Sequence, residues 1–474
     1  MKIYFLCLLL NLLAESVCGK NAWETTRDDI LDRELEMKSL ATSIIAYDKS
    51  KMTEAEVAAE VSRIEEKCDE LDCPCTVTKL DKIGVLDIVW SCDNHPPVES
   101  LDLDEDLEIG SEDGIATAFD FDFPNDPKFG EQWAFQNLEN NADINVIEGW
   151  EEYLSDEIGG NPEGPSVVVA VIDSGIDYNH PDLKDIMWEN PGEIPGDGID
   201  NDGNGIIDDV YGADFTAKGG PTGDPIDRNG HGTHCSGMVA GNGNNGVGIA
   251  GVASYTQGKV KLMACKGLND RAGGTYSGLL AALNYAITNG AKISSNSWGG
   301  GSVKNQEKIW DAVLRNNLDH LVIAAAGNDN KEFHENRKWM MCGLKEPNLL
   351  CVASSDRNDK RSSFSNYGID QVHVFAPGSG ILSTIPNNGY ASWSGTSMAT
   401  PIVSGLAALV LTMRPDLYAE CVRDVIEKNV QPKAAYADLV SSGGLIDVGN
   451  TMKSLKSGYN CTGKQTLLNY VHQM

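Results

Sequence analysis

Three residues whose side chains together can perform acyl transfer stand in short motifs far apart along the chain. Asp173 follows the apolar run Ser166–Ile172, His231 opens His-Gly-Thr-His-Cys-Ser-Gly, and Ser397 is the third residue of Gly-Thr-Ser-Met-Ala-Thr-Pro. A serine hydroxyl becomes a good nucleophile only when an imidazole takes its proton and a carboxylate orients that imidazole. Taken singly, the three have ordinary explanations: a turn cap, a cap or metal ligand, and a helix N-cap. Taken together, in the order Asp, His, Ser, they predict a catalytic triad.

An asparagine supplies a fourth group that this chemistry uses. Asn328 follows the apolar run Leu321–Ala326 after one glycine. Its amide and the backbone N–H of Ser397, at the start of a helix, would form an oxyanion hole for a tetrahedral intermediate. An asparagine in a turn after glycine is also common without any such role.

The helix expected after Ser397 limits the kind of hydrolase. Its apolar pattern covers Ile402–Met413, and Pro401 is expected in the first helical turn, where its missing N–H costs no helix bond. Ala399 stands where the Gly-x-Ser-x-Gly elbow of α/β-hydrolases has its second glycine. A secreted esterase built on that elbow is therefore a disfavoured alternative.

An acidic loop between Asp173 and His231 has the spacing of a calcium site. Oxygen-bearing side chains alternate with other residues over 197–209 and include a glycine where a tight loop must bend. The expected ligands match the first nine positions of an EF-hand loop: Asp200, Asp202, Asn204, the carbonyl of Ile206 and Asp208. Tyr211 occupies the twelfth position, where an EF-hand has a bidentate Glu, so the geometry must differ. We expect a structural Ca²⁺; a solvated acidic turn is the alternative.

The elements that must position these residues are predicted to form an α/β fold. Apolar runs of five to seven residues end in polar or glycine-rich turns: Ser166–Ile172, Val260–Lys266, Ala291–Ser295, Leu321–Ala326, Leu349–Ala353 and Val372–Ala376. Helix-like segments lie between several of them: His234–Ala240, Ser277–Asn289 and Asn305–Asn317. This alternation predicts a mostly parallel sheet with helices on both faces. Such sheets bind ligands beyond the carboxyl ends of their strands, where Asp173 and Asn328 fall.

In its four separated motifs the chain resembles the subtilisin-like serine proteases, or subtilases. The resemblance covers about Asn125–Leu409 and is carried by four blocks: Val171–Asp177, His231–Gly237, Ala325–Asn328 and Gly395–Pro401. It implies Asp173 as orienting acid, His231 rather than His234 as general base, Ser397 as nucleophile and Asn328 as oxyanion donor. Ile402 departs from many relatives, which have histidine there, but this position is not catalytic.

The substrate groove is implied by the same resemblance. Ser297-Trp298-Gly299-Gly300 resembles the edge strand that pairs with an extended substrate backbone. Ala325-Ala326-Gly327 would form the opposite wall of the pocket for the residue before the cut. Tyr276, Leu279 and Trp298 match the lining of a subsite three residues further upstream, which implies an apolar preference there. Core packing is the alternative for Trp298.

A second calcium site is also implied by resemblance alone. Its ligands would be Asp182, Asn245, the carbonyls of Gly243, Val247 and Ile249, and, as in some members, Asp126. Bound cations would offset part of the negative charge of the chain.

The first residues indicate the secretory route. Lys2 is followed by the apolar run Ile3–Ala14 and then by small residues, the pattern of a signal peptide. The run is shorter than the about 20 residues that span a bilayer. We expect residues 1–18 to be a signal peptide, and the protein to be secreted or held in a secretory organelle without stable membrane insertion.

Residues 19–120 resemble the family's propeptide, which assists folding and then blocks the active site. They contain patterns for a strand, a helix and a hairpin, followed by an acidic connector: Ser43–Tyr47, Thr53–Lys67, Cys75–Trp90 and Leu101–Gly114. This pattern is compatible with a small α+β inhibitor domain. We therefore expect a zymogen with a catalytic domain at 121–455 and a tail at 456–474.

The twelve cysteines are ordinary for an oxidising compartment. The preferred pairings are Cys342–Cys351 and Cys421–Cys461, and Cys235 is a candidate free thiol. Zinc is the less favoured interpretation of Cys73-Pro-Cys75. Asn460-Cys461-Thr462 is an N-glycosylation sequon.

The charge of the chain limits its partners. The 474 residues carry 37 basic and 70 acidic groups, a formal net charge of −33. Nucleic acid and anionic membranes are disfavoured because both attract basic surfaces. We expect protein or peptide substrates and, as intramolecular inhibitor, the protein's own propeptide. The alternative is a binding protein, such as an inactive calcium-dependent adhesion module on the same fold; the complete set of catalytic residues argues against it.

Overall fold

The computed structural model describes ten segments of the chain: 42–47, 54–70, 75–80, 85–90, 107–108, 123–156, 164, 166–300, 306–334 and 341–461. The chain divides into two compact units, Met1–Asp120 and Phe121–Met474. The expected signal peptide, most of the acidic connector and most of the expected tail lie outside the described residues.

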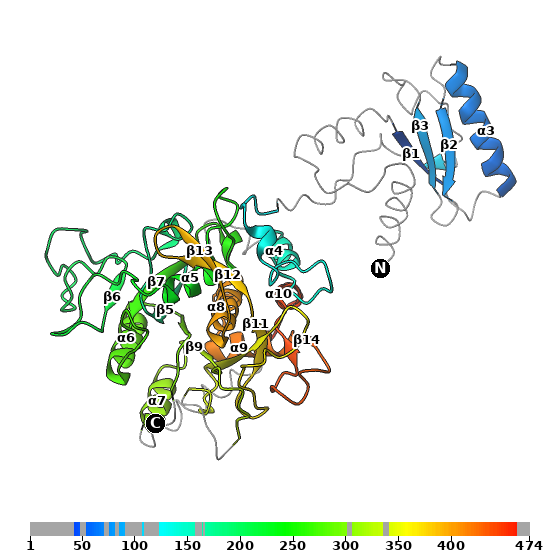
Figure 1. The fold of residues 1–474 in the computed structure, drawn as a ribbon. Coiled ribbons are helices and arrows are strands. Elements are labelled where there is room, and N and C mark those ends of the chain that lie inside the picture. The colour runs from blue at the N-terminus through cyan, green and yellow to red at the C-terminus, as the bar shows by residue number, and fades with distance from the viewer. Residues whose placement is uncertain are drawn as a thin grey trace. The chain divides into compact units, whose positions relative to one another are not determined.

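The first unit contains an antiparallel sheet and a helix (Figure 1). Its elements are β1 (Thr42–Tyr47), α3 (Glu54–Glu70), β2 (Cys75–Leu80), β3 (Val85–Trp90) and β4 (Leu107–Glu108), with strand order β2-β3-β1-β4. α3 buries Val57, Ile64 and Cys68, whose spacing places them on one helical face. A disulfide joins Cys68 to Cys75 and so ties α3 to the hairpin. The zinc interpretation of Cys75 is therefore wrong.

The second unit is built on a nine-stranded sheet (Figure 1). The strand order is β14-β15-β11-β10-β9-β8-β5-β7-β6, and every neighbouring pair is parallel except β14 with β15. The strands are β5 (Val167–Asp173), β6 (Gly212–Asp214), β7 (Val260–Lys266), β8 (Ile293–Asn296), β9 (Leu321–Ala325), β10 (Leu349–Ser355), β11 (Val374–Pro377), β14 (Gln431–Pro432) and β15 (Gly444–Leu445). The predicted mostly parallel α/β fold is confirmed.

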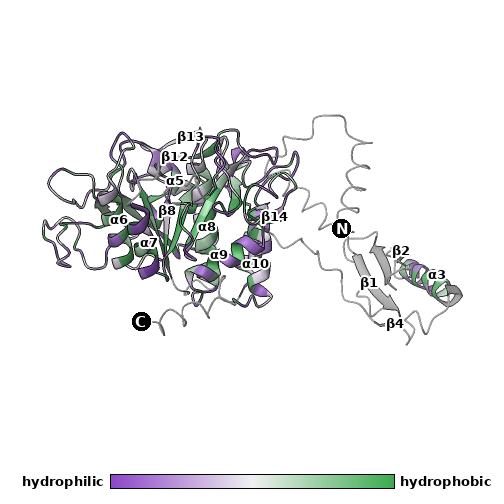
Figure 2. Ribbon diagram, turned by 90° about the horizontal axis from the view of Figure 1, so that it is seen from below, coloured by the Kyte–Doolittle hydropathy of each residue, from purple (hydrophilic) through white to green (hydrophobic). Residues whose placement is uncertain are grey.

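Helices cover both faces of this sheet, because alternate strand residues enter two separate hydrophobic clusters. From β5, Val169 and Val171 pack with one group of helices, whereas Ala170 and Ile172 pack with another. The first group is α4 (Val146–Leu154), α5 (His231–Ala240), α8 (Thr396–Met413), α9 (Ala419–Lys428) and α10 (Val448–Lys456). The second group is α6 (Tyr276–Thr288) and α7 (Gln306–Asn316). Figure 2 shows α8 as the most uniformly apolar of these helices, while α9 and α10 are polar on one side.

Shorter elements complete the unit. A two-stranded antiparallel hairpin, β12 (Ile381–Ile385) and β13 (Gly389–Trp393), precedes α8. Single 3₁₀ turns are η2 (Phe129–Glu131), η3 (Lys184–Ile186) and η4 (Ser254–Thr256). The predicted disulfides Cys342–Cys351 and Cys421–Cys461 are both present, and Cys235 is a buried free thiol.

The central helix begins earlier than its apolar pattern indicates. α8 is the one helix among the described residues with the length and apolar composition of a membrane span, but 94% of that span is buried inside the unit. Because α8 starts at Thr396, Pro401 lies within the helix, and the prediction that it stands in the first turn is wrong. Pro401 has no N–H to donate to the carbonyl of Ser397, four residues earlier. That carbonyl instead accepts the hydroxyl of Ser297 at 2.9 Å and the thiol of Cys235 at 3.4 Å.

Candidate active site

The end of β5 and the start of α5 bring Asp173 and His231 together. Asp173 is the last residue of β5 and is fully buried, and His231 is the first residue of α5. Nδ1 of His231 lies 2.8 Å from Oδ1 of Asp173, which also accepts the backbone N–H of Ser174 at 2.7 Å. A Cβ on Gly232 would lie 2.1 Å from the carbonyl oxygen of Gly175, so this close approach requires glycine. The carboxylate favours the Nδ1–H tautomer and leaves Nε2 of His231 available as a base.

The environment of His231 shifts its basicity. Burial alone lowers the pKa of His231, but the Asp173 carboxylate outweighs it and holds that pKa well above its usual value. Sγ of Cys235 lies 4.0 Å from Nδ1, but burial raises the pKa of this thiol, so it is uncharged at neutral pH. Asp173 is therefore the charge that acts on the imidazole.

Asn328 and the backbone of Ser397 converge on one point. Oδ1 of Asn328 accepts the backbone N–H and the hydroxyl of Thr396 at 2.9 and 3.0 Å, which leaves Nδ2 free to donate elsewhere. A Cβ on Gly395 would lie 3.5 Å from Nδ2 of Asn328 and 3.6 Å from the backbone nitrogen of Ser397. Glycine therefore leaves open a space bordered by both donors. Ser397 is the second residue of α8, so the positive end of the helix dipole lies at the same point. This is the geometry of an oxyanion hole.

The nucleophile is held by contacts from two directions. The hydroxyl of Ser397 donates to the carbonyl of Ser297 at 3.0 Å, and the hydroxyl of Ser297 donates to the carbonyl of Ser397 at 2.9 Å. Cys235, on the helix that begins with His231, donates to the same carbonyl of Ser397. The three sequence motifs thus meet at the carboxyl edge of the sheet, with the serine hydroxyl turned toward Ser297.

A comparison with known proteins decides the family. A family model described as the subtilase family matches residues 164–451. The chain belongs to the subtilase family. The resemblance expected from the four motifs is therefore confirmed.

The chain is similar to proteases over much of its length. "Subtilisin-like protease 1" of Plasmodium falciparum (isolate 3D7) is 31% identical over 335 residues, covering 67% of this chain and 47% of that protein. "Thermitase" of Thermoactinomyces vulgaris is 38% identical over 250 residues, covering 52% of this chain and 76% of that protein. The solved structure of a protease from Pseudoalteromonas arctica PAMC 21717 matches with a TM-score of 0.54 and 25% identity, covering 70% of this chain and 99% of that one. The chain spans about half the length of the Plasmodium relatives.

The two segments that the resemblance assigns to substrate binding follow strands β8 and β9 at the carboxyl edge of the sheet. Residues 297–300 follow β8, with Gly299 exposed, and Ala325 ends β9 just before Gly327. Tyr276 is the first residue of α6, and its hydroxyl lies 2.9 Å from where a Cβ on Gly300 would stand. The start of α6 therefore lies against the end of segment 297–300.

Two residues predicted to line the upstream subsite are mostly packed in the core. Leu279 is 4% exposed and Trp298 is 8% exposed, and both belong to the hydrophobic cluster beneath α6. Nε1 of Trp298 donates to the carbonyl of Ile172 at 2.8 Å. The core packing considered as the alternative for Trp298 thus accounts for most of its surface, and only its small exposed part can face a substrate.

The acidic insert gathers a different set of carboxylates from the one that its EF-hand spacing predicts. Carboxylate oxygens of Glu193, Asp200 and Asp202 lie within 4.8 Å of one another. Asp208 is not part of this cluster, and its carboxylate accepts the backbone N–H groups of Gly196 and Gly198 at 2.8 and 3.1 Å. Glu193 lies before the repeated Asp pattern, so the EF-hand spacing does not predict it as a ligand. The one sequence feature that could have indicated it is that it is a further acidic residue close to the loop.

This cluster has the chemistry of an oxygen-ligated cation site. Three carboxylates at such a separation repel one another unless a cation or protons lie among them. The other two predicted ligands, Asn204 and Ile206, make hydrogen bonds next to the cluster. Asn204 donates its amide to Asp202 at 3.0 Å, and Ile206 contributes its N–H to Oδ1 of Asn204 while burying its side chain.

The residues predicted for the second calcium site meet around loop 243–249. The carboxylate of Asp182 accepts Nδ2 of Asn245 at 3.0 Å, the N–H of Ile249 at 3.1 Å and the hydroxyl of Tyr390 at 2.9 Å. Asp126 accepts the N–H groups of the same loop, at 2.7 Å from residue 244 and 3.2 Å from Asn245. Gly243 and Val247 lie in this loop. Burial raises the pKa of Asp126 and of Asp182, and all these donors are uncharged, so a cation would relieve the buried negative charge.

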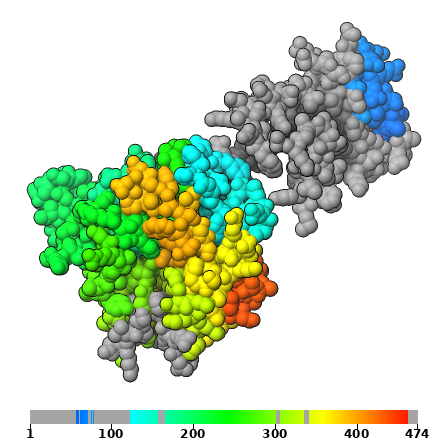
Figure 3. Space-filling view, in the orientation of Figure 1, coloured from blue at the N-terminus to red at the C-terminus, as the bar shows by residue number. Residues whose placement is uncertain are grey.

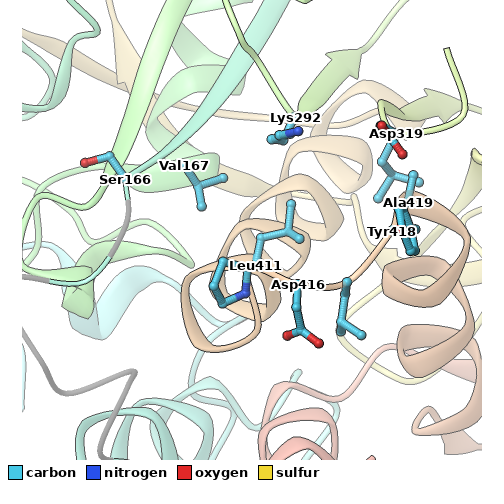
Figure 4. Close-up of a pocket in the computed structure, with 11 residues that line it drawn as sticks. Ser166, Val167, Lys292, Asp319, Leu411, Asp416, Tyr418 and Ala419 are labelled. Carbon is cyan, nitrogen blue, oxygen red and sulfur yellow. The ribbon is translucent and has the colours of Figure 1, made fainter. Parts of the chain in front are cut away.

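The pocket shown in Figure 4 lies at the edge of the sheet opposite to the triad. This cavity of about 290 Å³ is lined by Val167 and Leu321, at the amino ends of β5 and β9, and by Leu411 and Ala419 (Figure 4). The triad lies at the carboxyl ends of the same strands. We therefore assign the chemistry to the residues around Ser397 and not to this cavity.

Replacing Asn328 by leucine should lower kcat by about 10²–10³-fold with little change in KM, because the donor acts on the oxyanion of the transition state. Steady-state hydrolysis of a peptide p-nitroanilide measures the effect. The matched control is Asn330→Gly, two residues further on, where glycine accepts the φ of +53°. A kcat within threefold of wild type for Asn328→Leu would contradict the oxyanion assignment.

Proposed function

We propose that this protein is a secreted, calcium-stabilised serine endopeptidase that is made as a zymogen. The observation that carries the proposal is the 2.8 Å contact between Asp173 and His231 beside the two converging donors at Gly395. An inactive adhesion module has no need of such a pair of donors or of an oriented imidazole.

The residues have separate tasks in the proposed reaction. The Ser397 hydroxyl turns from Ser297 to His231, whose Nε2 takes its proton as Oγ attacks the substrate carbonyl. Hydrogen bonds of catalytic groups are often loose without substrate, so this rotation is an ordinary step. The carbonyl oxygen moves between Nδ2 of Asn328 and the Ser397 N–H, and Asp173 stabilises the imidazolium. His231 then protonates the leaving amine, and water releases the acyl group by the same steps in reverse order.

The proposed substrates are proteins or peptides bound in an extended conformation. Segment 297–300 follows β8 at the site and would pair with the substrate backbone, as a strand added to a sheet edge. Tyr276 and the small exposed parts of Leu279 and Trp298 would give an apolar subsite upstream of the cut. The names of the relatives, subtilisin-like protease and thermitase, agree with this class of substrate.

Labelling with a fluorophosphonate tests the proposed activity. Wild-type protein should be tagged at Ser397, as found by peptide mass spectrometry, and should turn over peptides as well as esters. Absence of labelling in correctly folded, mature protein would favour the adhesion module. Turnover of esters without peptides would favour an esterase.

Calcium is proposed at the two acidic sites as a structural ion. Glu193, Asp200 and Asp202 would hold one ion, and Asp126, Asp182, Asn245 and the carbonyls of loop 243–249 the other. Calcium takes six to eight oxygen ligands and supplies positive charge that stabilises clustered carboxylates. No step of the reaction needs it.

Chelation should destabilise the enzyme. An ion present at 100 times its dissociation constant adds about 2.7 kcal/mol, so for a catalytic domain of this size EDTA should lower Tm by about 4 °C for each ion removed and should speed autolysis. Glu193→Gln should reduce the response to EDTA. The exposed Asp185→Asn is the matched control and should respond as wild type does. Unchanged Tm and autolysis in EDTA would refute the calcium proposal.

Secretion and maturation are proposed from the leading region. The signal peptide pattern at 1–18 and the disulfides of the second unit support an oxidising compartment. The α+β elements of the first unit are those expected of a propeptide that inhibits its own catalytic domain.

A further inference from the structure

The acidic insert between β5 and α5 is joined to α6 by a buried hydrogen bond. The hydroxyl of Tyr285 donates to Oδ2 of Asp209 at 2.6 Å. Asp209 is fully buried and Tyr285 is 6% exposed. A buried carboxylate depends on such donors, because it has exchanged water for them.

Asp209 is also the point where the insert is held together. Its carboxylate accepts the side-chain amides of Asn190 and Asn204, each at 3.0 Å. Asn204 also donates to Asp202, so the network extends from the carboxylate cluster to Tyr285. Three uncharged donors thus converge on one buried charge.

Apolar packing reinforces the same junction. Ile206 of the insert is 6% exposed and enters the hydrophobic cluster that contains Leu279 and Tyr285 of α6. The ring of Tyr285 meets Trp188 edge-on, with centroids 6.4 Å apart, and lies 5.5 Å from Phe215. Figure 3 shows the teal surface of this part of the chain beside the green surface that includes α6.

The opposite end of α6 carries Tyr276 and Leu279, which the proposed function assigns to the upstream subsite. Tyr276 and Tyr285 lie nine positions apart, roughly 13 Å along one helix. Residues 269–275, which lead into α6, are exposed, so the loop before the helix adds little packing. The position of α6 must therefore be fixed mainly by the contacts of its buried face.

We propose that Tyr285 is a positioning residue for substrate specificity. Its bond to Asp209 fixes α6 against the acidic insert and thereby sets where Tyr276 and Leu279 stand in the groove. The inference rests on the proposed peptidase function and extends it: the insert acts on the upstream subsite and not on the triad.

Two substrates separate this role from general support of the fold. The first substrate is a tetrapeptide p-nitroanilide that has phenylalanine at the fourth position before the cut. The second is a dipeptide p-nitroanilide that has the last two residues of the first and so does not reach the upstream subsite. In protein expressed as the full chain and allowed to mature, Tyr285→Phe should raise KM for the tetrapeptide about 5–10-fold and change kcat less than twofold. The dipeptide kcat/KM should stay within twofold of wild type.

The matched control is Tyr436→Phe, a fully buried tyrosine that stacks on Phe375 near the other end of the sheet. It should leave both substrates unchanged. Equal losses on the two substrates for Tyr285→Phe, or no loss on either, would overturn the proposal.

A second measurement does not depend on peptide cleavage. Hydrogen exchange of backbone amides over 276–288 should be faster in Tyr285→Phe than in wild type, with 306–316 in α7 unchanged. Identical exchange over 276–288 would overturn the anchoring by Tyr285 even if the protein proved not to be a peptidase. A wild-type protein that resists fluorophosphonate yet shows this exchange difference would refute the proposed function alone.

Discussion

Replacing Ser397 by alanine should lower kcat by on the order of 10⁶-fold, the scale of the same loss in subtilisin. Without Oγ there is no alcohol to attack the peptide carbonyl, and His231 has no proton to accept. The folded state should change little, because the Ser397 hydroxyl makes one hydrogen bond, to Ser297, and such a bond contributes about 1 kcal/mol. Hydrolysis of a tetrapeptide p-nitroanilide and the Tm of the variant measure the two effects.

The same variant tests maturation. If the chain cuts itself between the acidic connector and Asn125, isolated Ser397→Ala precursor should remain full length and should not react with a fluorophosphonate. Ser404→Ala, at a fully buried position on the same helix, is the control and should mature normally. Processing of the isolated Ser397→Ala precursor would refute intramolecular maturation.

Replacing Asp173 by asparagine should lower kcat by about 10⁴-fold. The amide keeps the size of the side chain but can turn its N–H₂ toward Nδ1 of His231, which stabilises the wrong tautomer. The pH profile should move as well. In wild type, Asp173 holds the pKa of His231 above its usual value, so kcat/KM rises with pH through that raised pKa. In the variant the Asp173 charge is gone, and burial lowers the pKa of His231. The acid side of the kcat/KM profile should therefore move to lower pH.

The free energy of unfolding should also depend on the protonation of His231, but it should fall with rising pH, whereas kcat/KM rises. Because the folded-state pKa of His231 is raised, its pairing with Asp173 stabilises the fold fully below the unfolded-state pKa. That contribution is lost as pH rises through the folded-state pKa. Unfolding in urea across this range should show the loss in wild type and not in Asp173→Asn. Asp319→Asn, exposed at the amino edge of the sheet, is the control and should keep the wild-type profile. An acid limb that stays in place in Asp173→Asn would contradict the assigned source of the shift.

The sequence by itself predicted the central parallel strands, which the structure confirms, and it grouped the four residues proposed for catalysis. β7 has the bounds that its apolar run predicts, Val260–Lys266, because a strand buried on both faces is a continuous apolar segment. Asp173 and Asn328 could be placed at the carboxyl edge because each follows such a run. The match of four separated motifs to one family then related His231 and Ser397 to them before any distance was known.

The sequence predicted the first residues of helices less accurately than the bounds of the strands. α5 begins three residues before the predicted His234, and α8 begins six residues before its apolar pattern does at Ile402. Both starts contain glycine or small polar residues, which carry no apolar periodicity. They are helical because tertiary contacts hold them: Gly232 packs against Gly175, and Thr396 is bonded by Asn328.

Only the tertiary structure decided the contacts that join distant segments. It brought Glu193 to Asp200 and Asp202, bonded Asp208 to the backbone of Gly196, packed most of Trp298 in the core, and joined Asp209 to Tyr285. Spacing along the chain reports which side chains share a strand or helix face. It does not report which faces meet, because that depends on how the whole sheet twists and on which buried polar groups find partners.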